Sequence, residues 1–259
     1  MSSTLTQAKP NQATMLLDPP TILDEDFDEP IDPTKPLPKK YWPKVDHLIT
    51  EDDTPMDNIF SEKQQRLLAE SLYTSWSGPS DGASFIALAN VGLFPIPKNP
   101  AIVPDVLLSL DVELPADIWK KSNRSYMIWG YGKPPELVIE IVSNKKGEED
   151  NEKLQQYARM KVTYYVIYDP NKQLGEQTLQ AYHLQGRTYT KRQSLWFPDL
   201  EIGLVEWKGI YEKMESTWLR WCKEDQTIIP TGAERVAQEQ QRAERLIAQL
   251  RKLGVEPEA

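Results

Sequence analysis

The sequence of 259 residues predicts an α/β protein of the α+β kind, with a mixed central sheet flanked by helices. Short apolar runs bounded by glycine, proline and asparagine predict strands, and two amphipathic segments predict helices. The predicted order is helix, strand, strand, strand, helix, strand, strand, which favours a mixed sheet with helices packed on it. The predicted strands are residues 84–94, 102–110, 136–143, 163–168 and 177–184.

The two predicted helices each carry one apolar face. The first begins near Ser61, because Ser61 and Gln64 match a capping box, and it ends before Gly78. The second covers residues 147–160, where Leu154 and Tyr157 lie one turn apart. We therefore expect both helices to pack against the sheet.

Composition divides the chain into three parts. Residues 1–43 are acidic and rich in proline and predict a disordered leader, residues 44–212 form the folded domain, and residues 213–259 form a helical tail. The net charge is −9, and the first 60 residues contain 12 acidic and 5 basic side chains, which account for −7 of it. The leader is either a solvated tail or an acidic arm that masks a basic groove.

The tail carries a heptad pattern from Ala233 to Leu253. Apolar residues fill the a and d positions of about three heptads, except that the first d position is Glu239. The tail is either a helix that associates with a second copy or one that folds back on its own domain. The residues at the a positions are Val236, Ala243 and Leu250, and Leu246 and Leu253 occupy d positions.

The composition excludes several classes of protein. One cysteine, Cys222, excludes an internal disulfide, and with only His47 and His183 a zinc site built from cysteine and histidine is excluded as well. No apolar stretch reaches the roughly 18 to 20 residues that span a bilayer, and the N-terminus lacks the pattern of a signal peptide. We expect a cytoplasmic protein without a membrane partner.

Two carboxylates occupy predicted strands that are apolar on both faces. Glu140 shares a face with Val138, and Asp105 shares a face with Leu107. An unpaired carboxylate costs several kcal/mol in such a covered strand, and two neighbouring carboxylates repel each other unless a cation lies between them. Either the two acids hold a divalent metal ion, or each pairs with a basic side chain or reaches water at a strand end.

Lys153 borders the stripe by which the second helix meets the sheet, so its side chain could reach a strand end. The alternative is an exposed ion pair with Glu149, four residues earlier, which would contribute only a few tenths of a kcal/mol, by the order of magnitude of such pairs.

Four segments together resemble the Uma family, which is abundant in cyanobacteria and belongs to the PD-(D/E)XK superfamily of restriction-endonuclease-like proteins. The resemblance covers about residues 42–205, and the C-terminal charged helix is similar to the tail of many members. The segments are Pro104-Asp105-Val106, the run from Glu136 to Ser143, the run from Glu152 to Ala158, and the run from Tyr164 to Pro170.

The resemblance implies roles for individual residues. Asp105 corresponds to the metal-binding aspartate of the superfamily and Glu140 to its second acid. Val142 stands where the superfamily usually has lysine, and Lys153 on the following helix stands where this family places that function. The segment from Lys161 to Val166 departs from the family's Gly-Val-Pro-Glu-Tyr-Trp pattern, and the loop from Asp111 to Lys133 is long and individual.

Together these observations predict a DNA endonuclease. Asp105, Glu140 and the backbone carbonyl of Ile141 would hold Mg²⁺, or Mn²⁺ in its place, and Lys153 would assist the attacking water. The alternative is a non-catalytic DNA-binding or assembly module that keeps the fold. A homodimer is expected through the core or the C-terminal helix. Basic residues that could contact the DNA backbone are Lys120, Lys121, Arg124, Lys133, Lys145 and Lys146.

Overall fold

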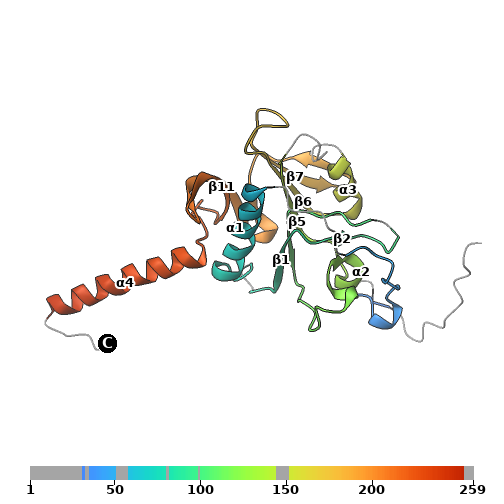
Figure 1. Ribbon diagram of the computed structural model, residues 1–259, viewed down its shortest axis with the longest axis horizontal. Coiled ribbons are helices and arrows are strands. Elements are labelled where there is room, and N and C mark those ends of the chain that lie inside the picture. The colour runs from blue at the N-terminus through green and yellow to red at the C-terminus, as the bar shows by residue number, and fades with distance from the viewer. Residues whose placement is uncertain are drawn as a thin grey trace, which may run out of the picture. The chain divides into compact units, whose positions relative to one another are not determined.

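The computed structural model describes residues 31–32, 35–50, 58–79, 82–98, 100–143 and 152–253, and the statements below concern these residues (Figure 1). The chain divides into a unit of residues 1–33 and a unit of residues 34–259, and the second unit carries every element described here. Most of the predicted leader, residues 147–151 of the second predicted helix, Lys145, Lys146 and Glu149 lie outside the described residues.

The core of the described chain is a mixed sheet of six strands in the order β1-β3-β5-β6-β7-β8. β5 and β6 run parallel, and the other neighbours run antiparallel. A parallel pair requires a crossover, and the crossover between β5 and β6 contains helix α3, Glu152–Met160. The strands are β1 Phe85–Ala89, β3 Val106–Leu110, β5 Leu137–Ile141, β6 Tyr164–Tyr168, β7 Leu179–Gln185 and β8 Thr188–Lys191.

The two faces of this sheet are covered by different elements. On one face, alternate residues of β3, β5 and β6 pack with helix α1, Ile59–Ser75, and with the C-terminal strands. On the other face the intervening residues pack with α3, which contributes the buried Tyr157. Figure 1 shows α1 and α3 on opposite sides of the sheet. Because both faces are covered, every residue of β3, β5 and β6 is buried.

A second sheet forms from the C-terminal part of the domain. The long hairpin of β10, Ile202–Tyr211, and β11, Met214–Cys222, pairs through β10 with the short β9, Trp196–Phe197. The side chain of Gln64 in α1 bonds both the N–H and the carbonyl of Leu219. The indole of Trp221 donates to the carbonyl of Leu68, so β11 is held directly against α1.

Smaller elements complete the domain. β2, Leu93–Phe94, pairs with β4, Tyr126–Met127, and α2, Ile128–Tyr131, follows β4. Leu37 N–H donates to the carbonyl of Trp129, so the described part of the leader next to the domain contacts α2. Single 3-10 turns lie at η1 Lys39–Tyr41, η2 Lys121–Asn123 and η3 Pro198–Leu200.

The N-cap of helix α1 lies three residues before Ser61, the capping residue that the sequence suggested. The N-cap is Asn58, whose side chain accepts a hydrogen bond from Ser61 N–H, and Ser61 is a buried residue inside the helix. The prediction of Ser61 as the cap was therefore wrong. Asparagine caps helices as well as serine does, so Asn58 was an equally good candidate.

The last helix, α4, covers Gly232–Lys252 and begins with a capping box formed by Thr231 and Glu234. It confirms the predicted C-terminal helix, but residues 214–222 of the predicted helical tail form β11 instead. The division into domains at 212–213 stays a prediction, and the hairpin β10–β11 crosses that position. Among the described helices, none has both the length and the apolar character needed to cross a membrane.

The α+β architecture with a mixed sheet is thus confirmed, with differences in strand bounds. The predicted strand 84–94 contains two strands, β1 and β2, and the predicted strand 102–110 begins as β3 only at Val106. Asp105 therefore lies in a bend directly before β3 rather than within the strand. This position makes it half-buried, whereas Glu140 lies inside β5 and is 1% exposed.

Candidate active site

Two carboxylates meet where the start of β3 lies beside the end of β5. The antiparallel register pairs Val106 with Ile139, so Asp105, one residue before Val106, lies next to Glu140 and Ile141. Ile141 N–H donates to Oδ2 of Asp105 at 2.6 Å. Asp105 is thereby fixed by the backbone of the residue that follows Glu140.

Glu140 is held by two side chains of helix α3. Nζ of Lys153 donates to Oε2 at 2.8 Å, and the hydroxyl of Tyr157 donates to Oε1 at 2.5 Å. Lys153 and Tyr157 are four residues apart and so project from the same face of the helix. The parallel crossover from β5 through α3 to β6 places that face above the sheet, which explains why residues 13 and 17 positions later reach Glu140.

The electrostatics of Glu140 reflect its burial. The pKa of Glu140 is raised to about 8, mainly because the side chain is removed from water. The charge and hydrogen bond of Lys153 and the hydroxyl of Tyr157 lower it, and the negative charge of Asp105 raises it. Burial and the neighbouring carboxylate also raise the pKa of Tyr157 well above its usual value, so its hydroxyl remains a donor. A carboxyl group with such a pKa can gain or lose a proton near neutral pH.

Asp105 receives its second hydrogen bond from helix α1 on the other face of the sheet. Nε2 of the buried Gln65 donates to Oδ1 at 2.5 Å, so both carboxylate oxygens of Asp105 accept donors. Helices on opposite faces thus each orient one acid of the pair. Asp105 is half-buried, whereas Glu140 is almost fully buried.

The contacts of the two acids are those that the sequence led us to expect without a metal ion. Glu140 pairs with a basic side chain and Asp105 lies at a strand end, as expected without a metal. The basic partner, however, is Lys153, the residue predicted to complete the site.

The donor set fits a hard divalent cation. Asp105 and Glu140 supply carboxylate oxygens from adjacent chain segments. Burial and, to a smaller extent, the charge of Asp105 raise the pKa of Glu140, and a nearby positive charge would offset both. Within the described residues no group of three or more His, Cys, Asp or Glu side chains forms a metal cluster. Two carboxylates with one carbonyl suit Mg²⁺, which keeps several waters, better than zinc.

The predicted DNA contacts are distributed over several places. Lys133 donates to the carbonyl of Leu110, at the opposite end of β3 from Asp105, so the structure does not bring it to the acids. Lys121 donates to the carbonyl of Asp46, Lys120 pairs with Asp117 at 3.7 Å, and Arg124 donates to the carbonyl of Trp119. These three surround η2.

Two residues of the site were not predicted from the sequence. Gln65 lies 40 residues before Asp105, and only the packing of α1 on the sheet reveals the contact. Tyr157 was expected to be an apolar residue of the helix stripe. Its spacing of four from Lys153 was the available signal, since a tyrosine at a buried position needs a partner for its hydroxyl.

The family comparison covers all of these positions. The family model Uma2, described as "Putative restriction endonuclease", matches residues 49–207, which is more than half of the chain. The match runs from ahead of α1 into β10 and includes both acids, Lys153, Gln65 and Tyr157. Comparison with curated proteins gives no match. The match confirms the resemblance drawn from the sequence motifs: the chain belongs to the Uma2 family of restriction-endonuclease-like proteins.

Proposed function

We propose that the protein is a metal-dependent endonuclease that hydrolyses phosphodiester bonds of DNA. Family membership indicates a nuclease, and the observation that carries the finer proposal is the arrangement around Glu140. A carboxylate that is 1% exposed lies beside a second carboxylate and a lysine at 2.8 Å. Metal-assisted hydrolysis at a phosphodiester requires acids to hold a cation and a basic group near the attacking water.

Asp105, Glu140 and the backbone carbonyl of Ile141 would hold Mg²⁺, with Mn²⁺ as a substitute. The bound ion supplies Lewis acidity, which lowers the pKa of water and offsets the charge of the phosphate. Gln65 and Ile141 N–H hold Asp105 in one orientation, which reduces the reorganisation that ligand binding requires.

Lys153 has the second role. With Glu140 holding a cation, the Nζ of Lys153 would be available to donate to a water or to a phosphate oxygen, and Tyr157 would keep its hydrogen bond to Oε1. We assign to Lys153 the orientation of the attacking water and the stabilisation of negative charge on the phosphate. The side chain of Lys153 is 26% exposed, so solvent reaches it.

We also propose which basic residues contact the DNA, where the protein acts and how it associates. Phosphate groups flanking the cleaved bond would contact Lys120, Lys121, Arg124, Lys145 and Lys146, whereas Lys133 serves the far end of β3. The protein would act in the cytoplasm and as a homodimer, with α4 as the associating element.

A supercoiled-plasmid assay tests the catalytic proposal. The full chain should convert supercoiled to nicked or linear DNA with Mg²⁺, and neither EDTA-treated protein nor Glu140→Gln should do so. Glu136→Gln is the matched control, because Glu136 also accepts from a lysine but lies at the other end of the sheet. Equal nicking by all preparations would point to a contaminant and overturn the proposal, and so would the absence of nicking by the wild-type protein over a broad range of DNA sequences.

A further inference from the structure

Helix α4 carries an apolar stripe along its whole length without cover in the described part of the chain. Val236 is 59% exposed, Leu246 51%, Leu250 37% and Leu253 78%. No residue of Gly232–Lys252 is buried by the other described residues. A helix of 21 residues that is amphipathic but solvated on all sides is marginal in water, and packing of the apolar stripe is what normally stabilises it.

The first turn of α4 is firmly attached to the domain. The Glu70 side chain accepts from Gly232 N–H at 2.7 Å, and the buried Arg220 donates to both carboxylate oxygens of Glu234, at 2.6 and 3.2 Å. Arg235 donates to the backbone carbonyl of Thr74 at the end of α1. These contacts fix the direction in which α4 leaves the domain, so its apolar stripe is presented in a defined orientation.

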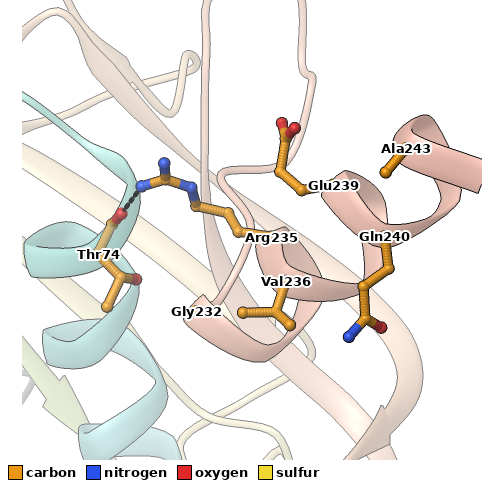
Figure 2. A pocket seen from close by; sticks show the side chains of 7 residues that line it. All are labelled: Thr74, Gly232, Arg235, Val236, Glu239, Gln240 and Ala243. Atoms are coloured by element: carbon orange, nitrogen blue, oxygen red, sulfur yellow. Dashed lines mark hydrogen bonds between the residues drawn. The ribbon is translucent and has the colours of Figure 1, made fainter. Parts of the chain in front are cut away.

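An open groove of about 570 Å³ lies where α4 leaves the domain. Figure 2 shows Arg235 reaching Thr74 on one side of the groove, with Val236, Gln240 and Ala243 following along α4. Val236 and Ala243 are the first two a positions of the heptad pattern. The groove therefore lies at the domain end of the apolar stripe. The end of a helix that packed along the stripe would lie in the groove.

We propose that a second copy of this chain occupies the stripe, as an antiparallel pair of α4 helices. The a and d positions repeat every seven residues and are self-complementary, which is typical of a helix that pairs with its own copy. In an antiparallel pair, layers of one a and one d residue form, with Val236 against Leu253 of the partner subunit and Ala243 against Leu246 of the partner subunit. The end of the partner's helix then fills the groove.

Glu239 decides against the parallel arrangement. In a parallel pair in register, the two Glu239 carboxylates would face each other in one d layer, and like charges in a desolvated layer repel. The antiparallel pair places each Glu239 opposite Leu250 of the partner subunit, so the two carboxylates lie in different layers, and each remains near Arg242 of its own helix, at 3.8 Å. Val236 and Leu253 are 17 residues apart, about 26 Å along the helix, so the two domains lie at opposite ends of the helix pair.

The proposed dimer does not depend on nuclease activity. The molar mass of the full chain in solution tests it. Sedimentation or light scattering of the full chain should give twice the monomer mass of 29.8 kDa. Leu246→Glu should weaken the dimer at least tenfold, and Gln241→Glu, on the opposite face of α4, should leave it unchanged. Thermal unfolding checks that the domain itself remains folded in both variants. A monomeric wild type, or a dimer that Leu246→Glu does not weaken, overturns the proposal.

Cross-linking tests the orientation. In a Cys222→Ser background, a mixture of Val236→Cys and Leu253→Cys chains should form a disulfide between the two different chains on oxidation. Neither chain alone should cross-link to itself, since equal residues are far apart in an antiparallel pair. Efficient cross-linking of Val236→Cys chains to one another would show a parallel pair and overturn the antiparallel assignment.

Discussion

The two ends of the β3–β5 strand pair each carry a lysine–glutamate contact, and the two contacts differ in burial. At one end, Lys133 pairs with Glu136, three residues later, and their side chains are 30% and 21% exposed. Both also bind the backbone of Leu110, through its carbonyl and its N–H. At the other end, Lys153 pairs with Glu140 across 13 residues, and the glutamate side chain is 2% exposed.

The comparison separates a structural ion pair from a candidate catalytic one. The contact at Leu110 satisfies the last backbone groups of a strand, and its charges remain partly hydrated. The contact at Glu140 lies beside a second carboxylate, and burial raises the pKa of this glutamate to about 8. The two lysine–glutamate pairs therefore differ in chemistry because Lys133 and Glu136 are partly exposed to solvent, whereas Glu140 is buried beneath helix α3.

Replacing the two lysines gives the largest expected contrast. Lys153→Met should reduce the rate of Mg²⁺-dependent plasmid nicking about 100-fold, since a group that orients water or stabilises the transition state contributes on that order. Lys133→Met should change the rate less than about threefold by the same scale. Initial nicking rates at saturating Mg²⁺ measure both effects. Equal loss of rate in the two variants would mean that the Lys153–Glu140 contact has no special role in catalysis.

The glutamates should differ in their effect on stability. The folded-state pKa of Glu140 lies above its unfolded value, so the folded state binds this proton more tightly, and the contribution of Glu140 to stability falls as pH rises from about 4.5 to 8. Glu140→Gln should therefore stabilise the metal-free protein increasingly over this range, by about 5 kcal/mol in total at pH 9, since each pKa unit corresponds to about 1.4 kcal/mol.

Urea unfolding in EDTA between pH 5 and pH 9 measures this gain. Glu136→Gln keeps an acceptor for Leu110 N–H and should change the free energy of unfolding by less than about 1 kcal/mol. A gain for Glu140→Gln that is constant with pH would mean that the carboxylate is ionised throughout.

The buried tyrosines provide a third matched pair. Tyr157→Phe removes a donor to Glu140 and should slow nicking about tenfold, within the range for lost hydrogen bonds to charged groups. Tyr126 bonds Ser109 and the carbonyl of Lys133 at the other end, so Tyr126→Phe should lower stability by about 1 kcal/mol without slowing the folded enzyme. Nicking rates and thermal unfolding of the same preparations measure the two effects. A Tyr126→Phe protein that nicks DNA slowly would contradict the assignment of Tyr126 to stability alone.

Adjacent glutamines on α1 give the smallest effect. Gln65→Met leaves Asp105 with one fewer donor and should raise the Mg²⁺ concentration for half-maximal nicking about threefold, in line with the loss of one positioning contact. Gln64 instead bonds the backbone of Leu219, so Gln64→Met should cost stability, about 2 kcal/mol, with an unchanged Mg²⁺ requirement. A shifted Mg²⁺ requirement in Gln64→Met would indicate that both glutamines act through the fold.

Glu140 was recognisable from the sequence because a charged residue inside a strand apolar on both faces needs an explanation, and the structure brings Asp105 and Lys153 to it. Gln65 was not recognisable from the sequence, because a glutamine on a helix is common and its partner, Asp105, lies 40 residues away. Local pattern identifies a polar residue that is out of place, but long-range packing decides which polar residues orient it.

The hairpin β10–β11 escaped prediction for a physical reason. Its two-residue turn, Glu212-Lys213, has positive φ at both positions, 44° and 66°. Such a turn is normally signalled by Asn-Gly or Asp-Gly, and neither occurs here. Exposure alternates at the turn end of the hairpin, over residues 205–211 and 214–217, and there the apolar residues stand between polar and charged ones. Without a turn signal, the segment could not be distinguished from a connection to the C-terminal helix.

The contact between Gln64 and Leu219 sets an order of events during synthesis. The two residues are 155 positions apart, so at 5 to 20 residues per second roughly 8 to 30 s separate their emergence from the ribosome. Until β11 is made, α1 can pack on the main sheet but lacks its hydrogen bonds to Leu219 and Trp221, so the segment that carries Gln65 is held from one side alone. A nascent chain that ends at residue 207, where the family match ends within β10, therefore carries both acids but not the completed support of the site.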